Sequence, residues 1–317
     1  MKKVSIIMSA YNEKEEWIKE SIDSIINQTY KNIEFIIVLD NPHNLKLKEV
    51  LSKYKNLDNR IKLIVNKQNL GLVESLNKAL NEASGEYIAR MDADDISLKN
   101  RIEEQVKYLE NHQDISLVAT QVEYIDENNK KIYIPPNYGI SQESAKKSLK
   151  YRNVFMHPTW MFRRSILIDL KKYNNIPTAE DYDFLCRLSL NGYNFIKIKK
   201  VLCKYRIRES SITNSKKMYQ KNVTDILKKR YRKAQKENIL DFYAIERILE
   251  DIKRIDNNNN NNNNRYWEAN KKYNIGIKKI MNKNLIIGSI LILYSLIINK
   301  DKLNDIKDSI ALKFINR

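Results

Sequence analysis

Short apolar runs alternate with amphipathic stretches along the first third of this chain, and this alternation limits the fold more than any other feature. The apolar runs cover residues 4–9, 33–39, 61–65 and 85–88. Between the first two runs, residues 15–28 repeat apolar side chains every three or four positions, as in a helix with one buried face. Strands that are apolar on both faces and alternate with helices predict an α/β fold, with a mostly parallel sheet flanked by helices.

Length and cysteine content place the protein in a broad class. At 317 residues, the chain can bury a substantial core and still carry an additional region. Cys186 and Cys203 are its two cysteines, and their spacing matches neither a metal site nor a disulfide framework. The apolar stretch after Lys2 and Lys3 is shorter than the core of a secretory signal. We therefore expect a cytoplasmic protein.

The formal net charge of +18 is concentrated toward the C-terminus. From residue 209 onward, 23 basic minus 12 acidic residues give +11, whereas the first 208 residues give 34 minus 27, or +7. A basic surface suits nucleic acid, anionic lipid or an anionic substrate, and charge alone does not choose among them.

Two segments stand out in the C-terminal part. The asparagine run 257–264 cannot form a core and predicts a solvated linker. The segment 285–298 is the most hydrophobic of the chain, but a helix of this length reaches only about 21 Å, short of the roughly 30 Å hydrocarbon core of a bilayer. Because lysines flank it, it either lies on an anionic cytoplasmic membrane surface or is buried against the rest of the protein or a second subunit.

Three aspartates, Asp92, Asp94 and Asp95, follow the strand predicted at residues 85–88. Ligands bind at the carboxyl ends of strands in open α/β sheets, and side chains two residues apart point to the same side of an extended backbone. Mg²⁺ or Mn²⁺ takes one or two protein carboxylates and leaves its other positions to water and phosphate, so the segment predicts a metal site for a nucleoside diphosphate. Arg90 either contacts the phosphates or neutralises the aspartates. Alternatively, Asp95 only caps the following helix.

Several motifs together carry a resemblance to a known family. They are residues 5–13 (SIIMSAYNE), 27–30 (NQTY), 69–71 (NLG) with Asn77, 85–88 (GEYI), 92–95 (DADD) and the distal pair at 180–181 (ED). In this order and spacing, the chain resembles the family 2 glycosyltransferases, and among them bacterial enzymes that build capsular, exopolysaccharide or lipopolysaccharide chains.

The resemblance implies a GT-A (Rossmann-like) catalytic domain at residues 1–212. Its nucleotide-sugar-binding half would be residues 1–115 and its acceptor-binding half residues 116–212, followed by a basic helical region at 213–317. The activity implied is a metal-dependent, inverting transfer of sugar from a nucleotide sugar, for which we expect a UDP-sugar. The acceptor would be a glycan or a lipid-linked glycan in surface polysaccharide biosynthesis.

The donor site implied by the resemblance draws on several strand ends. Asp40 stands where relatives contact the base, although residues 39–42 (LDNP) depart from the family's usual Asp-Asp-Gly-Ser, and Asp40 is alternatively a turn residue. Arg208 replaces a family histidine; it cannot be an ordinary metal ligand, so we expect it to hold phosphate. The other residues implied in nucleotide-sugar binding are Ser9, Ala10, Tyr11, Glu13, Asn69, Arg90, Asp92 and Ala93. Helix capping explains Asn69 equally well.

The pair Glu180–Asp181 opens a predicted helix, and in the family the aspartate of such a pair is the catalytic base. Inverting transfer is a single in-line displacement, so a base opposite the leaving diphosphate must take the proton of the acceptor hydroxyl. We expect Asp181 to be this base, with Glu180 and His157 near the acceptor. The alternatives are favourable charge at a helix N-terminus, worth about 0.3 to 1 kcal/mol per carboxylate, and a structural histidine.

Two other classes of protein fit parts of the sequence. A sugar-nucleotide nucleotidyltransferase also uses an α/β sheet with metal carboxylates, but needs a glycine-rich basic loop where this chain has Tyr11, Asn12 and Glu13. A non-enzymatic membrane- or nucleic-acid-binding protein fits the positive charge, yet it leaves the acidic motifs unexplained. The sequence does not choose an oligomeric state.

Overall fold

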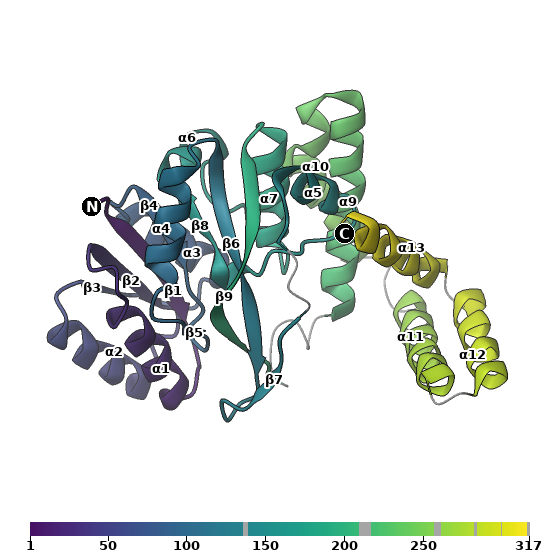
Figure 1. Ribbon diagram of the computed structural model, residues 1–317, viewed down its shortest axis with the longest axis horizontal. Helices are drawn as coiled ribbons and strands as arrows, with labels where there is room; N and C mark the ends of the chain where they lie inside the picture. Colours follow the sequence, from purple (N-terminus) through teal and green to yellow (C-terminus); the bar gives the residue numbers. More distant parts are fainter. Residues whose placement is uncertain (136–138, 209–216, 257–260, 282–283, 299, 316–317) are drawn as a thin grey trace. The chain divides into compact units, whose positions relative to one another are not determined.

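The structure is a computed structural model that describes residues 1–135, 139–208, 217–256, 261–281, 284–298 and 300–315 (Figure 1). The chain forms two compact units. The first comprises Met1–Leu149 and Asn153–Lys217, and the second comprises Lys150–Arg152 and Met218–Arg317. The boundary predicted between residues 212 and 213 lies outside the described residues.

The first unit is built on one sheet with the strand order β3-β2-β1-β4-β8-β6-β9-β5, and β7 pairs with β6. The strands are β1 Val4–Ala10, β2 Ile33–Leu39, β3 Ile61–Val65, β4 Tyr87–Arg90, β5 Ile96–Ser97, β6 Ile115–Ile125, β7 Lys131–Tyr133, β8 Met161–Arg163 and β9 Asn194–Arg206. Strands β1 to β4 are parallel, whereas β8 runs antiparallel to both β4 and β6. The predicted α/β class is confirmed, and the sheet is parallel in its first half and mixed in its second.

Helices cover both faces of this sheet (Figure 1). They are α1 Glu15–Ile26, α2 Leu45–Leu57, α3 Leu72–Glu82, α4 Arg101–Asn111, α5 Gln142–Ser148, α6 Leu167–Leu170 and α7 Glu180–Leu190, with 3₁₀ turns η1 His157–Thr159 and η2 Arg164–Ile166. The apolar faces of α1, α2 and α4 share one core with alternate residues of β1, β2 and β4. Because side chains of a strand alternate between faces, the other residues of β1 and β2 face α3.

The register of the strands brings the candidate residues to one edge of the sheet. Ala10 pairs with Leu39, and Ile7 pairs with Arg90, so the segments after β1, β2 and β4 leave the sheet at neighbouring carboxyl ends. Strand β9 runs for 13 residues, and its far end pairs with β5, directly after the three aspartates. Residues 206–208 are thereby carried back to the acidic segment.

The second unit is helical. Its elements are α9 Lys217–Glu237, η3 Leu240–Tyr243, α10 Ile245–Asp256, α11 Asn261–Met281, α12 Leu285–Ile298 and α13 Lys300–Ile315. The segment predicted as an apolar helix is α12. Of the predicted asparagine linker, residues 257–260 lie outside the described part, and residues 261–264 begin α11 instead of continuing a linker. Asparagine costs only a few tenths of a kcal/mol per helical position, so a stronger following helix can include it. No helix in the described ranges combines the length and apolarity needed to cross a bilayer.

Candidate active site

The acidic segment between β4 and β5 is fixed by polar side chains of α1. The Ser21 hydroxyl donates to the Asp92 carbonyl oxygen at 2.9 Å, and the Ser24 hydroxyl accepts from the Ser97 amide at 3.0 Å. Gln28 donates to the Leu98 carbonyl at 2.8 Å. Ser21 and Ser24 are spaced three residues apart on α1, and Gln28 follows just after the end of this helix, so α1 and the residues directly after it hold the acidic segment in place.

Arginines pair with two of the aspartates. Arg90, whose side chain is 1% exposed, forms an ion pair with Asp92, and Arg208 Nε lies 2.7 Å from Asp94 Oδ2. The Arg206 backbone amide donates to Asp95 Oδ1 at 2.8 Å, whereas Asp95 Oδ2 is buried with no hydrogen-bond partner. In this structure Arg90 and Arg208 both pair with aspartates of the cluster, and a contact of Arg90 with the phosphates stays a prediction.

Burial and mutual repulsion raise the pKa values of these carboxyl groups. Burial, followed by the charge of Asp92, raises the pKa of Asp94 to about 6. Burial also raises the pKa of Asp95 well above its ordinary value, with Asp94 and Asp92 adding to the effect. The cluster is thus short of positive charge even with its arginines, and it would gain from a further cation.

Trp17 supports the arginines that reach this cluster. The guanidinium carbons of Arg206 and Arg208 lie 5.2 Å and 5.8 Å from the centre of its ring, within the range of a cation–π interaction. The Arg206 side chain is fully buried and donates to the Asp94 carbonyl at 2.8 Å and to a carboxylate oxygen of Glu20 at the same distance. Arg206 therefore has a structural role. Of the two arginines that lie against Trp17, only Arg208 forms an ion pair with one of the three aspartates among the described contacts.

The carboxyl ends of β1 and β2 carry the residues predicted for the nucleoside. Ser9 and Ala10 end β1, where the Ala10 carbonyl accepts from the Asp40 amide at 2.8 Å. Tyr11 is exposed, and its amide donates to a Glu13 carboxylate oxygen at 2.7 Å. Burial raises the pKa of Glu13. These residues form a tight turn with one aromatic side chain facing solvent.

Asp40 is almost fully buried and fixes the loop that precedes α3. Its Oδ1 accepts from the Asn66 side chain at 2.7 Å and from the Leu70 amide at 2.8 Å, and its Oδ2 accepts from the Gly71 amide at 2.8 Å. Gly71 has a φ of 86°, a left-handed conformation that favours glycine. Asn69 is exposed, and its side chain also accepts from the Gly71 amide, at 3.0 Å. Asp40 thus shapes this loop, and its contact with a base stays a prediction.

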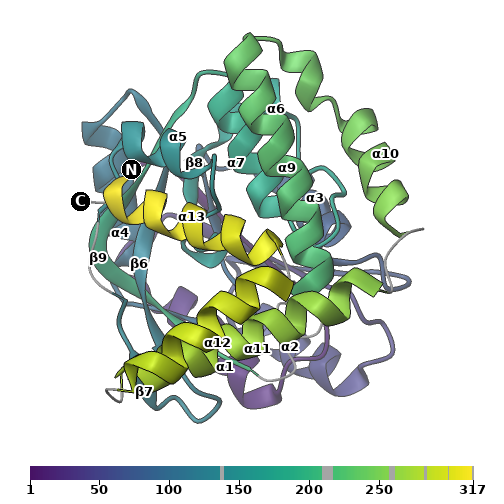
Figure 2. The same ribbon diagram turned by 90° about the vertical axis from the view of Figure 1, so that its right-hand side faces the viewer.

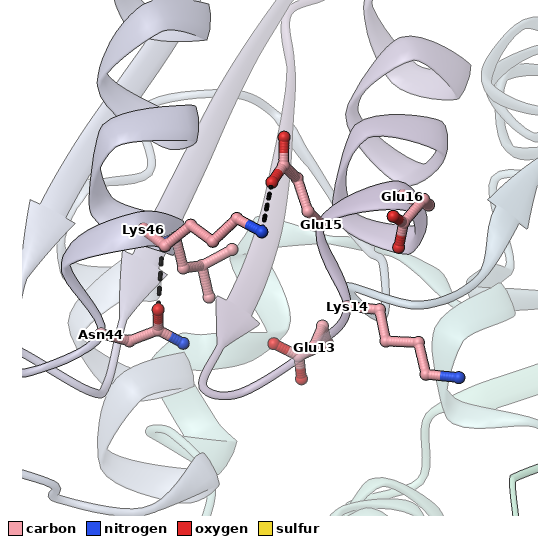
Figure 3. Close-up of a pocket in the computed structure, with 7 residues that line it drawn as sticks. Glu13, Lys14, Glu15, Glu16, Asn44 and Lys46 are labelled. Carbon is pink, nitrogen blue, oxygen red and sulfur yellow. Dashed lines mark hydrogen bonds and ion pairs between the residues drawn. The ribbon is translucent and has the colours of Figure 1, made fainter.

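A small cavity of about 290 Å³ opens between the N-termini of α1 and α2, next to these residues (Figure 3). It is lined by Glu13, Lys14, Glu15, Glu16, Asn44, Lys46 and Leu47. Lys46 and Glu15 form an ion pair across it at 3.1 Å, and Asn44 caps α2 by accepting from the Leu47 amide at 3.0 Å. Three acidic side chains in its wall make it a poor site for phosphate.

Glu180 and Asp181 form a second acidic centre at the start of α7. Asp181 accepts from the Asn153 side chain and from the Tyr182 amide, each at 2.7 Å. Burial raises the pKa of Asp181 to about 6, and burial together with the charge of Asp181 raises the pKa of Glu180 to about 8. The charge of Asp92 adds to both shifts, so the two acidic centres are close enough to interact. Burial therefore outweighs the helix N-terminus, which alone would lower these pKa values.

The backbone before α7 is in an unusual conformation. Thr178 has a φ of 63°, which is uncommon for a β-branched residue and typical of strained functional segments. It sets the start of the helix that carries Glu180 and Asp181. Asp183, further along the same helix, instead accepts from Arg187 Nε at 2.8 Å and is fully buried, so its role is structural.

His157 lies beside this centre among aromatic side chains. Its Nε2 is 2.8 Å from the Tyr173 hydroxyl, and its ring packs against Trp160. Burial, with the nearby charge of Arg90, lowers the pKa of His157 well below its ordinary value, so the ring is neutral at neutral pH. The Asn77 side chain fixes the backbone of Tyr173: it donates to the Tyr173 carbonyl oxygen at 2.9 Å and accepts from the Tyr173 amide at 3.0 Å. This arrangement favours the alternative of a structural histidine.

The aspartates after β4 offer the kind of oxygen atoms that divalent cations bind in proteins. They offer hard oxygen atoms, the Asp92 side chain is 30% exposed, and Asp95 keeps a buried oxygen without a hydrogen-bond partner. Within the described residues, no three acidic, histidine or cysteine side chains converge into a complete cage. This is the donor set expected for Mg²⁺ or Mn²⁺, which keeps several positions for water and phosphate.

Several residues that shape the site were not singled out from the sequence. They are Ser21, Ser24, Asn66, Arg101 and Asn153. Arg101 is fully buried in α4 and donates to the Arg90 carbonyl oxygen at 2.6 Å, and it also donates to the Gln105 side chain. Polar residues at helical spacing on otherwise apolar helix faces were the available signal for Ser21, Ser24 and Arg101. Asn66 and Asn153 lie outside helices and gave no such signal.

Comparison with known proteins extends these observations. A family model described as glycosyl transferase family 2 matches residues 5–189. An uncharacterized glycosyltransferase of Methanocaldococcus jannaschii is 44% identical over 218 residues, covering 68% of this chain and 74% of that protein. The O-antigen biosynthesis glycosyltransferase WbnJ of Escherichia coli is 33% identical over 237 residues, covering 72% of this chain and 90% of that protein.

A solved structure supports the fold independently. S. aureus TarS 1–349 in complex with UDP-GlcNAc matches with a TM-score of 0.57 at 20% identity, covering 71% of this chain and 66% of that one. At this level of identity the likeness concerns the fold.

Proposed function

The chain belongs to glycosyl transferase family 2, and from this membership we propose that it transfers a sugar from a UDP-sugar to a hydroxyl group of a glycan or lipid-linked glycan, with inversion at the anomeric carbon. The observation that carries the proposal is the pairing of two unlike acidic centres at one edge of the sheet. One is balanced by arginines, and the other holds a carboxyl group with a pKa near neutrality.

The donor would bind along the carboxyl ends of β1, β2 and β4. The diphosphate belongs at Asp92 and Asp94, where Arg208 can exchange Asp94 for a phosphate oxygen, because a guanidinium suits phosphate geometry. The nucleoside belongs between Tyr11 and the loop that Asp40 fixes. The UDP-GlcNAc of the TarS structure supports the choice of uridine.

Asp92 and Asp94 would hold Mg²⁺ or Mn²⁺, with Asp95 behind them. A divalent cation supplies positive charge to a leaving diphosphate. The protein contributes the rigid placement of the three aspartates by α1 and the counterbalancing Arg90.

Asp181 would remove the proton from the acceptor hydroxyl as its oxygen attacks the anomeric carbon. The C–O bond to the leaving diphosphate breaks in the same step, and the proton ends on Asp181. A pKa of about 6 leaves Asp181 ionised at neutral pH but more basic than an ordinary aspartate. Asn153 and the Tyr182 amide fix its orientation.

The name of the WbnJ relative supports an acceptor in surface polysaccharide synthesis, because that protein is described as an O-antigen biosynthesis glycosyltransferase. O-antigen is a glycan, so a sugar hydroxyl of a growing glycan is the acceptor that this relative favours.

A panel of nucleotides, tested by thermal shift with and without Mn²⁺, checks the donor proposal. A ligand at about 100 times its Kd stabilises the folded state by about 2.7 kcal/mol, which is readily measured. We expect UDP with Mn²⁺ to stabilise the protein, and Asp94→Ala to abolish the effect of the metal. Stabilisation by another nucleotide would replace uridine in the proposal. No stabilisation by any nucleotide, combined with salt-sensitive binding to RNA or DNA, would favour a nucleic-acid-binding protein.

A further inference from the structure

Helix α12 in the second unit exposes large apolar side chains along one face. Ile286, Ile290, Leu293 and Ile297 recur at intervals of three or four residues, and between 58% and 80% of each is exposed. This set is called the α12 stripe. In a soluble helix, such a stripe would face the core.

The same helix buries two of its three small residues instead. Gly288 and Ser295 are buried, and Gly288 packs against Gly276 of α11 so closely that a Cβ on either glycine would lie 2.8 Å from the other's carbonyl oxygen. Figures 1 and 2 both show α11 and α12 side by side. Small residues inside and large apolar residues outside is the arrangement of helices in lipid, where burying isoleucine between helices brings no gain over contact with acyl chains.

Basic residues accompany the α12 stripe. Residues 261–298 contain six lysines and arginines but one acidic residue, and α12 itself has no charged residue. Lys271, Lys278 and Lys279 of α11 are exposed. Lys272 places its ammonium group 5.9 Å from the ring centre of Tyr294, which is itself half exposed on α12. The hairpin thus joins an apolar face to an excess of positive charge.

We propose that the α11–α12 hairpin binds the surface of a bilayer that contains anionic lipid, with the α12 stripe inserted at the boundary between headgroups and acyl chains. Helix α12 has 14 residues and is too short to span the membrane, so it would lie in the plane of the interface. The lysines would meet the negative headgroups, which attract basic residues near the membrane surface.

A second copy of the chain is a poorer match for the same surface. A symmetric dimer places the same patch of each copy face to face, and would bring the lysines of both hairpins together. Like charges at an interface disfavour association, whereas anionic lipid relieves the same repulsion. Charge complementarity therefore selects lipid as the occupant.

Vesicle flotation of the full chain tests the proposal. We expect the wild type to float with phosphatidylcholine vesicles that contain about 30% phosphatidylglycerol, and much less with phosphatidylcholine alone, because the anionic surface attracts the lysines. Ile297→Glu should weaken binding to the anionic vesicles by about tenfold or more, since it places a charge at the apolar boundary. The double variant Ile286→Glu/Ile297→Glu should abolish it.

The chain offers a matched control in its first unit. Ile168 of α6 is 82% exposed, compared with 80% for Ile297, so Ile168→Glu makes the same change at nearly the same exposure in the other unit. It should bind vesicles like the wild type. Circular dichroism melting would establish that both variants are folded, which their exposure predicts.

The outcomes separate lipid from the alternative occupants. Equal losses of vesicle binding in Ile168→Glu and Ile297→Glu would overturn the proposal. A wild type that binds neither kind of vesicle would also overturn it. If the wild type binds neither vesicle, analytical ultracentrifugation would measure its oligomeric state. A wild-type dimer that becomes a monomer in Ile286→Glu/Ile297→Glu would show that the α12 stripe is an interface between two copies of the chain. If Lys278→Gln/Lys279→Gln binds anionic vesicles as tightly as the wild type, the proposed attraction between the lysines and the anionic headgroups is wrong.

Discussion

The two acidic centres of the first unit both consist of carboxylate side chains, but the partners of these carboxylates differ in charge. Asp92 and Asp94 are paired with the cationic side chains of Arg90 and Arg208. Asp181 receives hydrogen bonds only from neutral donors among its described contacts, the Asn153 side chain and the Tyr182 amide.

This difference in partners separates two kinds of chemistry. A centre that is paired with arginines can bind a charged ligand by exchanging one of these ion pairs, such as that of Arg208, for a contact with the ligand. For the second centre, the described residues include no ion pair with Glu180 or Asp181. This pair changes its charge by gaining or losing a proton, and its pKa values are about 8 and about 6. We therefore assign charge binding to the first centre and proton transfer to the second. The predictions below test this division.

The largest expected effect comes from the second centre. Asp181→Asn should lower turnover by about 10² to 10⁴, because the variant keeps the size of the side chain and an oxygen that can accept one of the two hydrogen bonds, but it cannot take a proton. Its affinity for UDP should be unchanged. UDP release with the donor and acceptor found by screening measures turnover, and turnover near that of the wild type would remove Asp181 as the base.

A smaller effect is expected from the first centre. Arg208→Gln should weaken UDP binding by roughly 10- to 100-fold, the equivalent of one lost charge-assisted hydrogen bond, and leave uridine binding unchanged. Lys14→Gln is the control, since Lys14 also lies over Trp17, at 4.3 Å, but pairs with Glu127 instead of Asp94. Equal losses for UDP and uridine in Arg208→Gln would mean that Arg208 supports the fold instead of the phosphates.

The pH dependence of turnover distinguishes the members of the acidic pair. As the pH falls below the pKa of Asp181, about 6, the base becomes protonated, and kcat/KM should fall by about tenfold per pH unit. Glu180→Gln should keep this acid limb and remove any alkaline limb near pH 8, because glutamine has no proton to lose. An acid limb that disappears in Glu180→Gln would instead make Glu180 the base.

The smallest effect concerns stability. The folded-state pKa of Glu180, about 8, lies above its ordinary value of 4.5, so the folded protein keeps a proton that the unfolded chain has lost. Stability is therefore lost as the pH rises through this interval. Glu180→Gln removes the loss and should raise the free energy of unfolding by about 1–2 kcal/mol above pH 8, with no gain below about pH 4.5.

Thermal melting at alkaline and acidic pH measures this difference. Glu143→Gln is a suitable control, because Glu143 is exposed and its pKa is lowered by a hydrogen bond from Lys147. It should show no gain at alkaline pH. If Glu180→Gln gains the same stability over the wild type at every pH, the gain comes from side-chain packing and not from removal of the carboxylate charge.

The parallel half of the fold could be predicted because it depends on local patterns. The apolar runs and amphipathic stretches before Ala83 correspond to β1, β2, β3, α1, α2 and α3 within a few residues. The second half depends on distant pairing. Strand β6 runs from Ile115 to Ile125, and β9 pairs with it along most of this length although the two strands are far apart in the sequence.

The candidate site divides in the same way. Motif spacing identified the aspartates and Asp181, because chemistry requires those residue types at those strand and helix ends. It could not reveal that Asp94 pairs with Arg208, which is more than a hundred residues away and arrives through the pairing of β5 with β9. It also could not reveal that the pKa of Asp181 is raised, because burial of the start of α7 depends on the tertiary structure.

The most direct test of the division between the centres is UDP binding by Asp94→Asn and Asp181→Asn, measured by calorimetry with and without Mn²⁺. This measurement needs no acceptor. The account predicts that Asp94→Asn loses the enhancement by metal while Asp181→Asn binds UDP and metal like the wild type. Loss of metal-dependent binding in Asp181→Asn, with binding intact in Asp94→Asn, would contradict it.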